Sequence, residues 1–213
     1  MLRTTRRNWL AISGLASAAG ALSGGTAGPI SKDAQASARD AIRNRYFPNV
    51  VLTTHEGKKV RFYDDLIKDK IVVINLMYAR CEGACPLITS NLAKVQKLLG
   101  ERVGRDIFMY SITVNPEQDT RKALKDYARM HGVGPGWLFL TGRPNDIELL
   151  RRRLGFVDPN PEVDKDKSRH SGMVRYGNEP RTLWASFQGQ AKPEWIVESI
   201  SWVDEPKNQL AKR

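Results

Sequence analysis

Cys81 and Cys85 are the only cysteines in this chain of 213 residues, and three residues separate them. Thiolates are soft ligands that favour Cu(I), and two neighbouring thiols can also exchange a disulfide with another protein. Metal binding and thiol–disulfide exchange are therefore both open for this pair. A purely structural disulfide is a third interpretation, but so short a loop would constrain little of the unfolded chain.

The segment before the cysteines predicts a strand buried on both faces. Residues 71–77 (IVVINLM) form an apolar run rich in β-branched side chains. After the cysteines, Pro86 suits the first position of a helix and Gly100 its end. Apolar residues recur on one face of that helix at Ile88, Leu92, Val95 and Leu99. Both thiols would then lie near a helix N-terminus, where the dipole and free N–H groups favour thiolate.

Strand and helix patterns alternate along the rest of the chain. A hairpin is expected within residues 46–62, and strands at 107–114 and 137–140 each precede a helix. Two more strands, near 173–176 and 182–187, precede a final helix. This order predicts an α/β fold in which a central mixed sheet carries helices on both faces and an N-terminal β-hairpin.

The N-terminus has the pattern of an export signal. Residues 5–10 (TRRNWL) resemble the twin-arginine motif, and an uncharged run of 14 residues follows from Trp9 to Leu22. That length fits a signal peptide better than a membrane span, which needs about 20 residues. We expect a signal over residues 1–27 and a periplasmic protein, membrane-associated if the signal is not cleaved.

The remaining chain divides into a linker at 28–45, one domain at 46–205 and a polar tail at 206–213. The net charge is +11, and removing residues 1–27 would leave +8 because Arg3, Arg6 and Arg7 are lost. This excess favours an acidic protein partner or an anionic membrane surface. Nucleic acid is not an expected partner, because no stripe of alternating aromatic and basic residues is present.

Several motifs together resemble the Sco/SenC copper-assembly family, a branch of the thioredoxin fold. They are the Cys-x-x-x-Cys-Pro turn after a strand, the segment 115–120 (NPEQDT), the segment 140–142 (LTG), and a His-Ser pair that begins at His170. The resemblance covers roughly residues 48–203. It implies that Cys81, Cys85 and His170 bind one copper ion, Cu(I) or Cu(II).

Three positions depart from the family pattern. Glu82 replaces the usual Pro after the first cysteine, Asn115 replaces Asp before Pro116, and Arg169 replaces the Asp before the histidine. A ligating imidazole normally leans on a carboxylate or a carbonyl, so Arg169 argues against tight Cu(II) binding more than against Cu(I).

Two functions follow as hypotheses. The resemblance implies an exported chaperone that delivers copper to a respiratory copper centre, such as that of cytochrome c oxidase, or that reduces its cysteines. The partner would be an oxidase subunit or another copper-accepting protein. The alternative is an enzyme, a periplasmic thiol-disulfide oxidoreductase or thiol peroxidase, in which Cys81 attacks and Cys85 resolves. Only the copper hypothesis requires His170.

Overall fold

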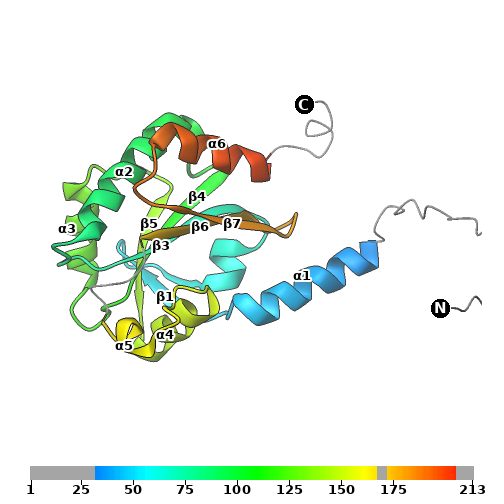
Figure 1. Cartoon of the computed structure of the whole chain (residues 1–213), viewed down its shortest axis with the longest axis horizontal. Coiled ribbons are helices and arrows are strands. Elements are labelled where there is room, and N and C mark those ends of the chain that lie inside the picture. Colours follow the sequence, from blue (N-terminus) through cyan, green and yellow to red (C-terminus); the bar gives the residue numbers. More distant parts are fainter. Residues whose placement is uncertain (1–31, 167–171, 205–213) are drawn as a thin grey trace, which may run out of the picture. The chain divides into compact units, whose positions relative to one another are not determined.

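The computed structural model describes residues 32–166 and 172–204. Within these ranges one mixed sheet of seven strands runs in the order β2-β1-β5-β4-β3-β6-β7 (Figure 1). The strands are β1 (Val51–Thr54), β2 (Lys59–Arg61), β3 (Ile71–Met77), β4 (Ile107–Thr113), β5 (Trp137–Gly142), β6 (Met173–Asn178) and β7 (Leu183–Gln188). Strands β3, β4 and β5 are parallel to one another, and the others join antiparallel.

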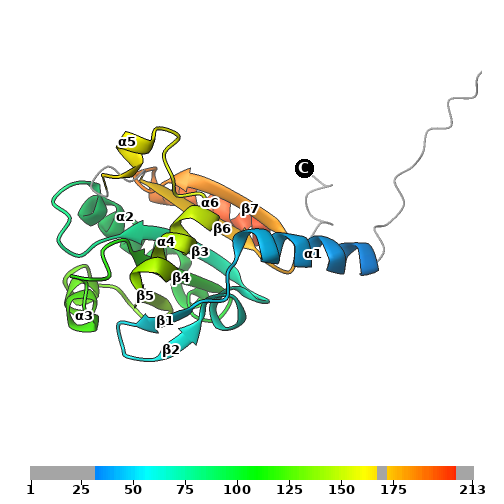
Figure 2. The same cartoon turned by 90° about the horizontal axis from the view of Figure 1, so that it is seen from below.

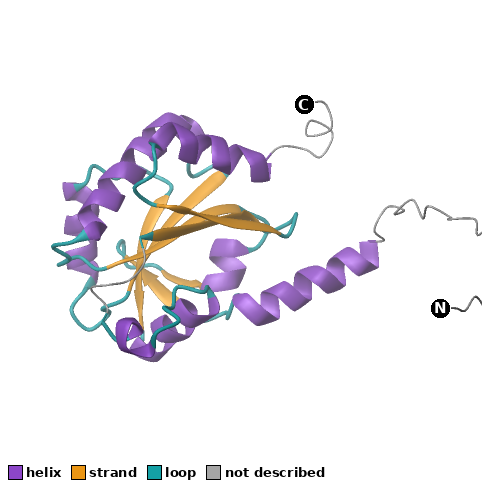
Figure 3. Cartoon of the chain, viewed as in Figure 1, coloured by secondary structure: helices purple, strands orange, loops and turns teal. Residues whose placement is uncertain are grey.

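Helices cover both faces of the sheet (Figures 2 and 3). They are α1 (Lys32–Tyr46), α2 (Ala84–Leu99), α3 (Arg121–Met130), α4 (Pro144–Arg153), α5 (Pro161–Asp164) and α6 (Pro193–Asp204), with a π-helical segment at Phe62–Ile67 and a 3₁₀ turn at Gly100–Arg102. Helices α2, α3 and α6 pack on one face. Helix α4 and the π-helical segment pack on the other.

Strand β3 is the centre of both cores. All seven of its side chains are buried, with Val73 and Met77 in the core under α2 and with Val72 and Ile74 in the opposite core. The continuous apolar run therefore forms the strand that the sequence predicts. The mixed sheet, the helices on both faces and the β1–β2 hairpin are confirmed as well.

The segment predicted to be a linker, 28–45, contains most of a helix. Residues 32–46 (KDAQASARDAIRNRY) include four alanines and lack Gly and Pro, which favours helix formation. Arg39 ties this helix to the domain, because its guanidinium pairs with Glu179 and with Asp69. Within the described ranges, no helix combines the length and the apolar character that crossing a membrane requires.

Helix α2 begins earlier than the sequence predicts. It starts at Ala84, after the N-cap residue Gly83, so Cys85 lies in its first turn and not in the loop before it. Pro86 is compatible with this position because the first N–H groups of a helix have no partner within the helix.

Candidate metal and thiol site

The two cysteines lie at the exit of β3 and in the first turn of α2. Cys81 is 6% exposed, Cys85 is 2% exposed, and no disulfide joins them. Met77 is the last residue of β3, so a loop of only a few residues connects the buried strand to Cys81. The strand and the helix therefore fix both ends of the segment that carries the sulfur atoms.

The surroundings of Cys81 lower the pKa of its thiol. Burial raises the pKa of its thiol, but hydrogen bonds to the sulfur from the Cys85 side chain, the Cys85 and Gly83 backbone N–H groups, and the Tyr78 hydroxyl outweigh burial and hold the pKa below its ordinary value. Backbone donors at a helix N-terminus stabilise an anion in this way. The helix start thus favours the charged form of Cys81 in particular.

Cys85 and Tyr78 hold their protons. Burial and the hydrogen bond to Cys81 raise the pKa of Cys85 to about 12. Burial and the hydrogen bond to Cys81 likewise raise the pKa of Tyr78 to about 12. The site therefore contains one sulfur whose pKa is lowered and two hydrogen-bond donors directed at it.

Asp119 fixes the backbone of the cysteine loop. It is 1% exposed, and its Oδ2 accepts hydrogen bonds from the Ala79 N–H at 3.0 Å and from the Thr113 hydroxyl at 2.5 Å. The sequence places Asp119 in the NPEQDT segment, where the next residue, Thr120, caps α3 by accepting from Ala123 N–H. The segment thus joins β4, α3 and the cysteine loop.

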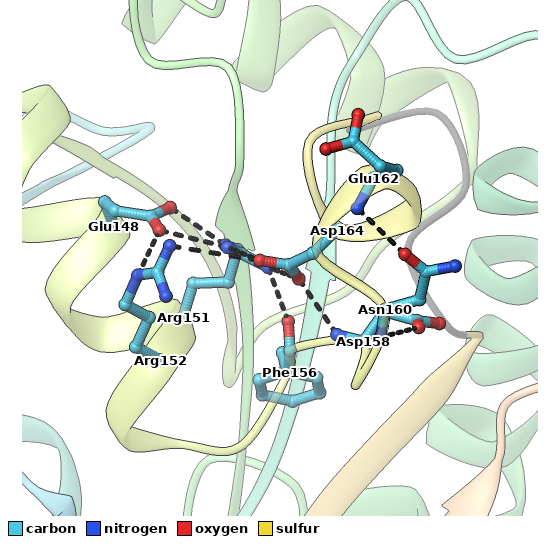
Figure 4. Close-up of polar contacts among 8 residues, drawn as sticks. All are labelled: Glu148, Arg151, Arg152, Phe156, Asp158, Asn160, Glu162 and Asp164. Atoms are coloured by element: carbon cyan, nitrogen blue, oxygen red, sulfur yellow. Dashed lines mark hydrogen bonds and ion pairs between the residues drawn. The ribbon is translucent and has the colours of Figure 1, made fainter.

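A second anchor holds the chain that leads towards His170. The Arg151 guanidinium donates to both oxygens of Asp164, at 2.6 and 2.7 Å, and also to Glu148 and to the Phe156 carbonyl (Figure 4). Both partners of the Arg151–Asp164 pair are largely buried, at 11% and 12% exposure. The hydrogen bonds from Arg151 hold the pKa of Asp164 well below its usual range. This pair fixes α5 against α4.

His170 and Arg169 lie outside the described residues, and the nearest described residues, Asp166 and Gly172, interact with neighbours of the cysteines and not with the cysteines themselves. On one side, the charge of Asp166 acts on the Tyr78 hydroxyl, which contacts Cys81. On the other, a methyl group placed on Gly172 would come within 3.0 Å of Ile88 Cδ1, one helical turn beyond Cys85. Gly172 also accepts a hydrogen bond from Gly189 N–H at 2.7 Å.

Sequence reasoning identified the two sulfur atoms but not Tyr78 or the loop contact of Asp119. Tyr78 directly follows a buried strand, which is a weak signal for a site residue. Of the departures from the family pattern, Glu82 is exposed, and Asn115 N–H donates to the Thr113 hydroxyl at 2.9 Å. In residues 32–166 and 172–204, no group of three or more His, Cys, Asp or Glu side chains is arranged to hold a metal ion.

Comparison of the sequence with known proteins identifies a family and several relatives. The SCO1/SenC family model matches residues 39–204. The SCO1 protein homolog of Bacillus subtilis (strain 168) is 32% identical over 132 residues, which is 60% of this chain and 66% of that protein. The matched region thus spans just under two thirds of that relative's length.

Solved structures show the same fold. The Bradyrhizobium japonicum ScoI structure with copper bound has a TM-score of 0.59 and 22% identity, and the match covers 72% of this chain and 96% of that one. BsSco, described as a Sco-family cytochrome c oxidase assembly protein with a disulfide switch, has a TM-score of 0.59 and 22% identity over 72% of this chain and 90% of its own. The fold is thioredoxin-like, as the sequence predicts.

Proposed function

Because the chain belongs to the SCO1/SenC family, we propose that it binds one copper ion through Cys81, Cys85 and His170 and takes part in the assembly of a respiratory copper centre. Copper is here the cargo of the protein. Two thiolates select Cu(I), and an imidazole adds a borderline donor that is also acceptable to Cu(II). Three protein ligands leave one side of the ion open for transfer to an acceptor.

The observation that carries the proposal is the pair of buried cysteine side chains at the start of α2, one of which, Cys81, accepts hydrogen bonds that lower its pKa. Burial raises the pKa of Cys81, but hydrogen bonds from the Cys85 thiol, from backbone N–H groups and from the Tyr78 hydroxyl outweigh burial and lower it, which favours the charged form that binds a metal. Copper would replace the proton of Cys85, and its charge would offset the cost of a second buried thiolate.

The positions of Asp166 and Gly172, the described residues on either side of His170, support the third ligand. Gly172 lies against α2 and is two residues from His170, so the Cα atoms of these two residues are within about 7 Å of each other. Asp166, on the other side, acts on Tyr78. A His170 imidazole that reaches the two sulfur atoms is therefore compatible with the chain connectivity.

The finer assignment is delivery of copper to, or reduction of the cysteines of, an oxidase subunit. The sequence relatives and the neighbour described as a cytochrome c oxidase assembly protein support an acceptor of this class. In this role the protein turns over no small substrate. The positive net charge of +11 suits an acidic acceptor or an anionic membrane surface.

A second candidate is thiol–disulfide exchange, which the unequal thiols favour. The Cys81 thiolate would attack a disulfide of a partner, forming a mixed disulfide and releasing one partner thiolate. Cys85 would lose its proton and attack the Cys81 sulfur, which leaves a Cys81–Cys85 disulfide and a second partner thiol. The partner is reduced by two electrons and this chain is oxidised by two.

Copper stoichiometry tests the proposal. The full chain is reduced, loaded with Cu(I) without oxygen, dialysed against a competing chelator and analysed for metal by mass spectrometry. We expect one copper per wild-type chain, substantial loss in Cys85→Ser and His170→Ala, and retention in the matched control His131→Ala. Wild-type protein that retains no copper would refute the proposal.

Two assays together, disulfide reduction and metallation of an acceptor, separate the two candidates when Cys81→Ser is added to these variants. If exchange is the main work, His170→Ala reduces a disulfide substrate at the wild-type rate, whereas Cys81→Ser does not. If copper delivery is the main work, His170→Ala fails to metallate an acceptor although its thiols remain reducing.

We also propose export, which rests on residues 1–27 and so lies outside the described residues. The pair Arg6-Arg7 and the uncharged run from Trp9 to Leu22 support it. The periplasm is oxidising, which allows a cysteine pair to change between thiol and disulfide.

A further inference from the structure

The two edges of the sheet differ in how well they are protected against pairing with another chain. Strand β2, at one edge, has three residues, of which Lys59 and Arg61 are charged and exposed. Strand β7, at the other edge, has six residues (LWASFQ), and none of them is charged or a proline (Figure 2). Short length, charged side chains and proline are the usual means by which an edge strand avoids pairing with a further strand. Strand β7 has none of these features.

The outer side of β7 offers free backbone groups. The Gly189 N–H donates to the Gly172 carbonyl at 2.7 Å, which marks these residues as a hydrogen-bonded pair at the end of the β6–β7 ladder. Because hydrogen-bonded pairs alternate along an antiparallel ladder, the N–H and C=O groups of Trp184, Ser186 and Gln188 point away from β6. Within residues 32–166 and 172–204, no strand pairs with this side of β7, and no hydrogen bond uses the N–H of Trp184 or Ser186.

Helix α6 lies beside this edge and exposes two tryptophans. It contacts β6 and β7 on one face of the sheet and contacts α2 on its flank. Trp195 and Trp202 lie about two helical turns apart on one side of α6, and they are 47% and 48% exposed. Asp204 of α6 pairs with Arg102, which follows α2. Since residues two positions apart on a helix differ by about 200° around its axis, Trp202 points away from α2 and towards the β7 edge.

Charge favours a second copy of this chain as the occupant of the edge. The chain carries a net charge of +11, so two copies repel each other wherever their basic surfaces meet. An uncharged strand avoids this repulsion, whereas an acidic partner would be matched by cations that β7 lacks. If β7 pairs antiparallel with its copy around Ser186, Trp184 lies opposite Gln188 and Ala185 lies opposite Phe187, and no like charges face each other.

The same two-fold arrangement brings the two copies of α6 together. Helix α6 lies over the last two strands of the sheet, and neighbouring strands are about 4.8 Å apart. Two copies of α6 would therefore be separated by about two strand spacings, roughly 10 Å, which is near the distance between packed helices. Trp195 and Trp202 of both copies would face this space and fill it.

We propose that the chain forms a homodimer in which β7 pairs antiparallel with β7 of a second copy and the two α6 helices pack through Trp195 and Trp202. Each copy contributes the same surface, as in a two-fold symmetric dimer. The backbone hydrogen bonds of the edge align the two strands, and the tryptophans supply the apolar area.

Sedimentation velocity of the full chain over a concentration series tests the proposal, in reducing buffer so that no intermolecular disulfide contributes. The mass of the wild type approaches twice that of one chain as the concentration rises. Ser186→Lys places two cations against each other at the two-fold axis and raises the dimer dissociation constant about tenfold or more. Trp195→Ala and Trp202→Ala each remove apolar contact area and weaken the dimer about tenfold or more.

The matched control is Ser37→Lys, which adds the same charge at an exposed position of α1 and leaves the dissociation constant unchanged. Because both tryptophans are half exposed, their variants keep the test valid if Ser186→Lys fails to fold. The proposal is overturned if the wild type is a monomer at every concentration, or if Ser186→Lys and both tryptophan variants dimerise like the wild type. Copper binding is tested separately, and its failure leaves the expected dimer unchanged because the cysteines take no part in the edge.

Discussion

The two thiols of the candidate site differ because their donors differ. Cys81 receives hydrogen bonds from Tyr78 and from two backbone N–H groups, whereas Cys85 is more deeply buried and donates to Cys81. The sequence alone indicates that both thiols lie near a helix start, but it cannot rank them. The ranking depends on the deeper burial of Cys85 and on the hydrogen bonds that Cys81 accepts from the Cys85 thiol and from the backbone N–H groups of Cys85 and Gly83, with a smaller contribution from the Tyr78 hydroxyl.

Tyr78→Phe is predicted to raise the pKa of Cys81. The substitution removes one donor to the thiolate and keeps the ring, so the charged form loses stabilisation. We expect the pH of half-maximal Cys81 alkylation, measured by mass spectrometry, to rise. Tyr46→Phe, on α1, is the control and should leave the profile unchanged. Identical profiles for wild type and Tyr78→Phe would contradict the role of the hydroxyl.

At the scale of elements, the site depends on contacts between segments distant in sequence. Asp119, between β4 and α3, holds Ala79 in the loop after β3. The Arg151–Asp164 pair holds α5 against α4, just before the segment that contains His170. Each anchor joins an irregular segment to a regular element, which is how a rigid scaffold positions functional loops.

Asp119→Ala is predicted to destabilise the fold by about 2–3 kcal/mol, because two buried donors lose a charged acceptor. Urea unfolding of wild type and variant measures the difference. The control Asp126→Ala removes an exposed carboxylate on α3 that pairs with Lys122 and Arg129, and it should cost less than about 1 kcal/mol. Equal costs for the two variants would show that Asp119 is not a structural anchor.

The elements were largely predictable from the sequence, and the exceptions have physical causes. The buried strand and the periodic helices were found because burial requires their apolar patterns. Helix α1 was missed although its segment is rich in Ala, because the contact that ties it to the domain, Arg39 with Glu179, spans 140 positions and is not visible in the local sequence. The short helix α5 was missed because it is a single turn, capped by Asn160, and one turn has no apolar periodicity to detect. Residues 167–171 lie outside the described ranges, so the role of His170 stays a prediction.

At the scale of the whole molecule, Glu179 connects α1 to the sheet. It is 3% exposed and accepts hydrogen bonds from Arg39, from the Tyr63 hydroxyl at 2.8 Å and from Asp69 N–H at 2.8 Å. Burial raises the pKa of Glu179, but these donors outweigh burial and hold the pKa below its ordinary value. Folding therefore stabilises the carboxylate form of Glu179 relative to its protonated form.

Glu179→Gln is predicted to make the free energy of unfolding depend less on pH at acid pH. A depressed folded-state pKa adds stability that is present above the unfolded pKa and lost as pH falls through the folded pKa. The free energy of unfolding of wild type should exceed that of the variant by about 2 kcal/mol near neutral pH. This difference should shrink below about pH 4. Urea unfolding across this range measures it, with exposed Glu198→Gln as control. A difference in unfolding free energy that does not change with pH would contradict the lowered pKa of Glu179.

Export is a prediction for the whole chain. Replacing Arg6 and Arg7 together by Lys keeps the charge and removes the twin-arginine pattern, which is an address read by a receptor. We expect the variant to remain inside the cell in a bacterial host that exports the wild type, as measured by fractionation. Arg3→Lys is the control. Unchanged export of the double variant would favour an ordinary secretory signal.

The most direct test of the central claim is X-ray absorption at the copper edge of the Cu(I)-loaded full chain. The account predicts two sulfur ligands and one imidazole nitrogen in wild type, and loss of the nitrogen in His170→Ala with both sulfur atoms retained. His131→Ala should match wild type. A copper shell without sulfur, or a wild-type shell that His170→Ala leaves unchanged, would contradict the three-ligand copper site.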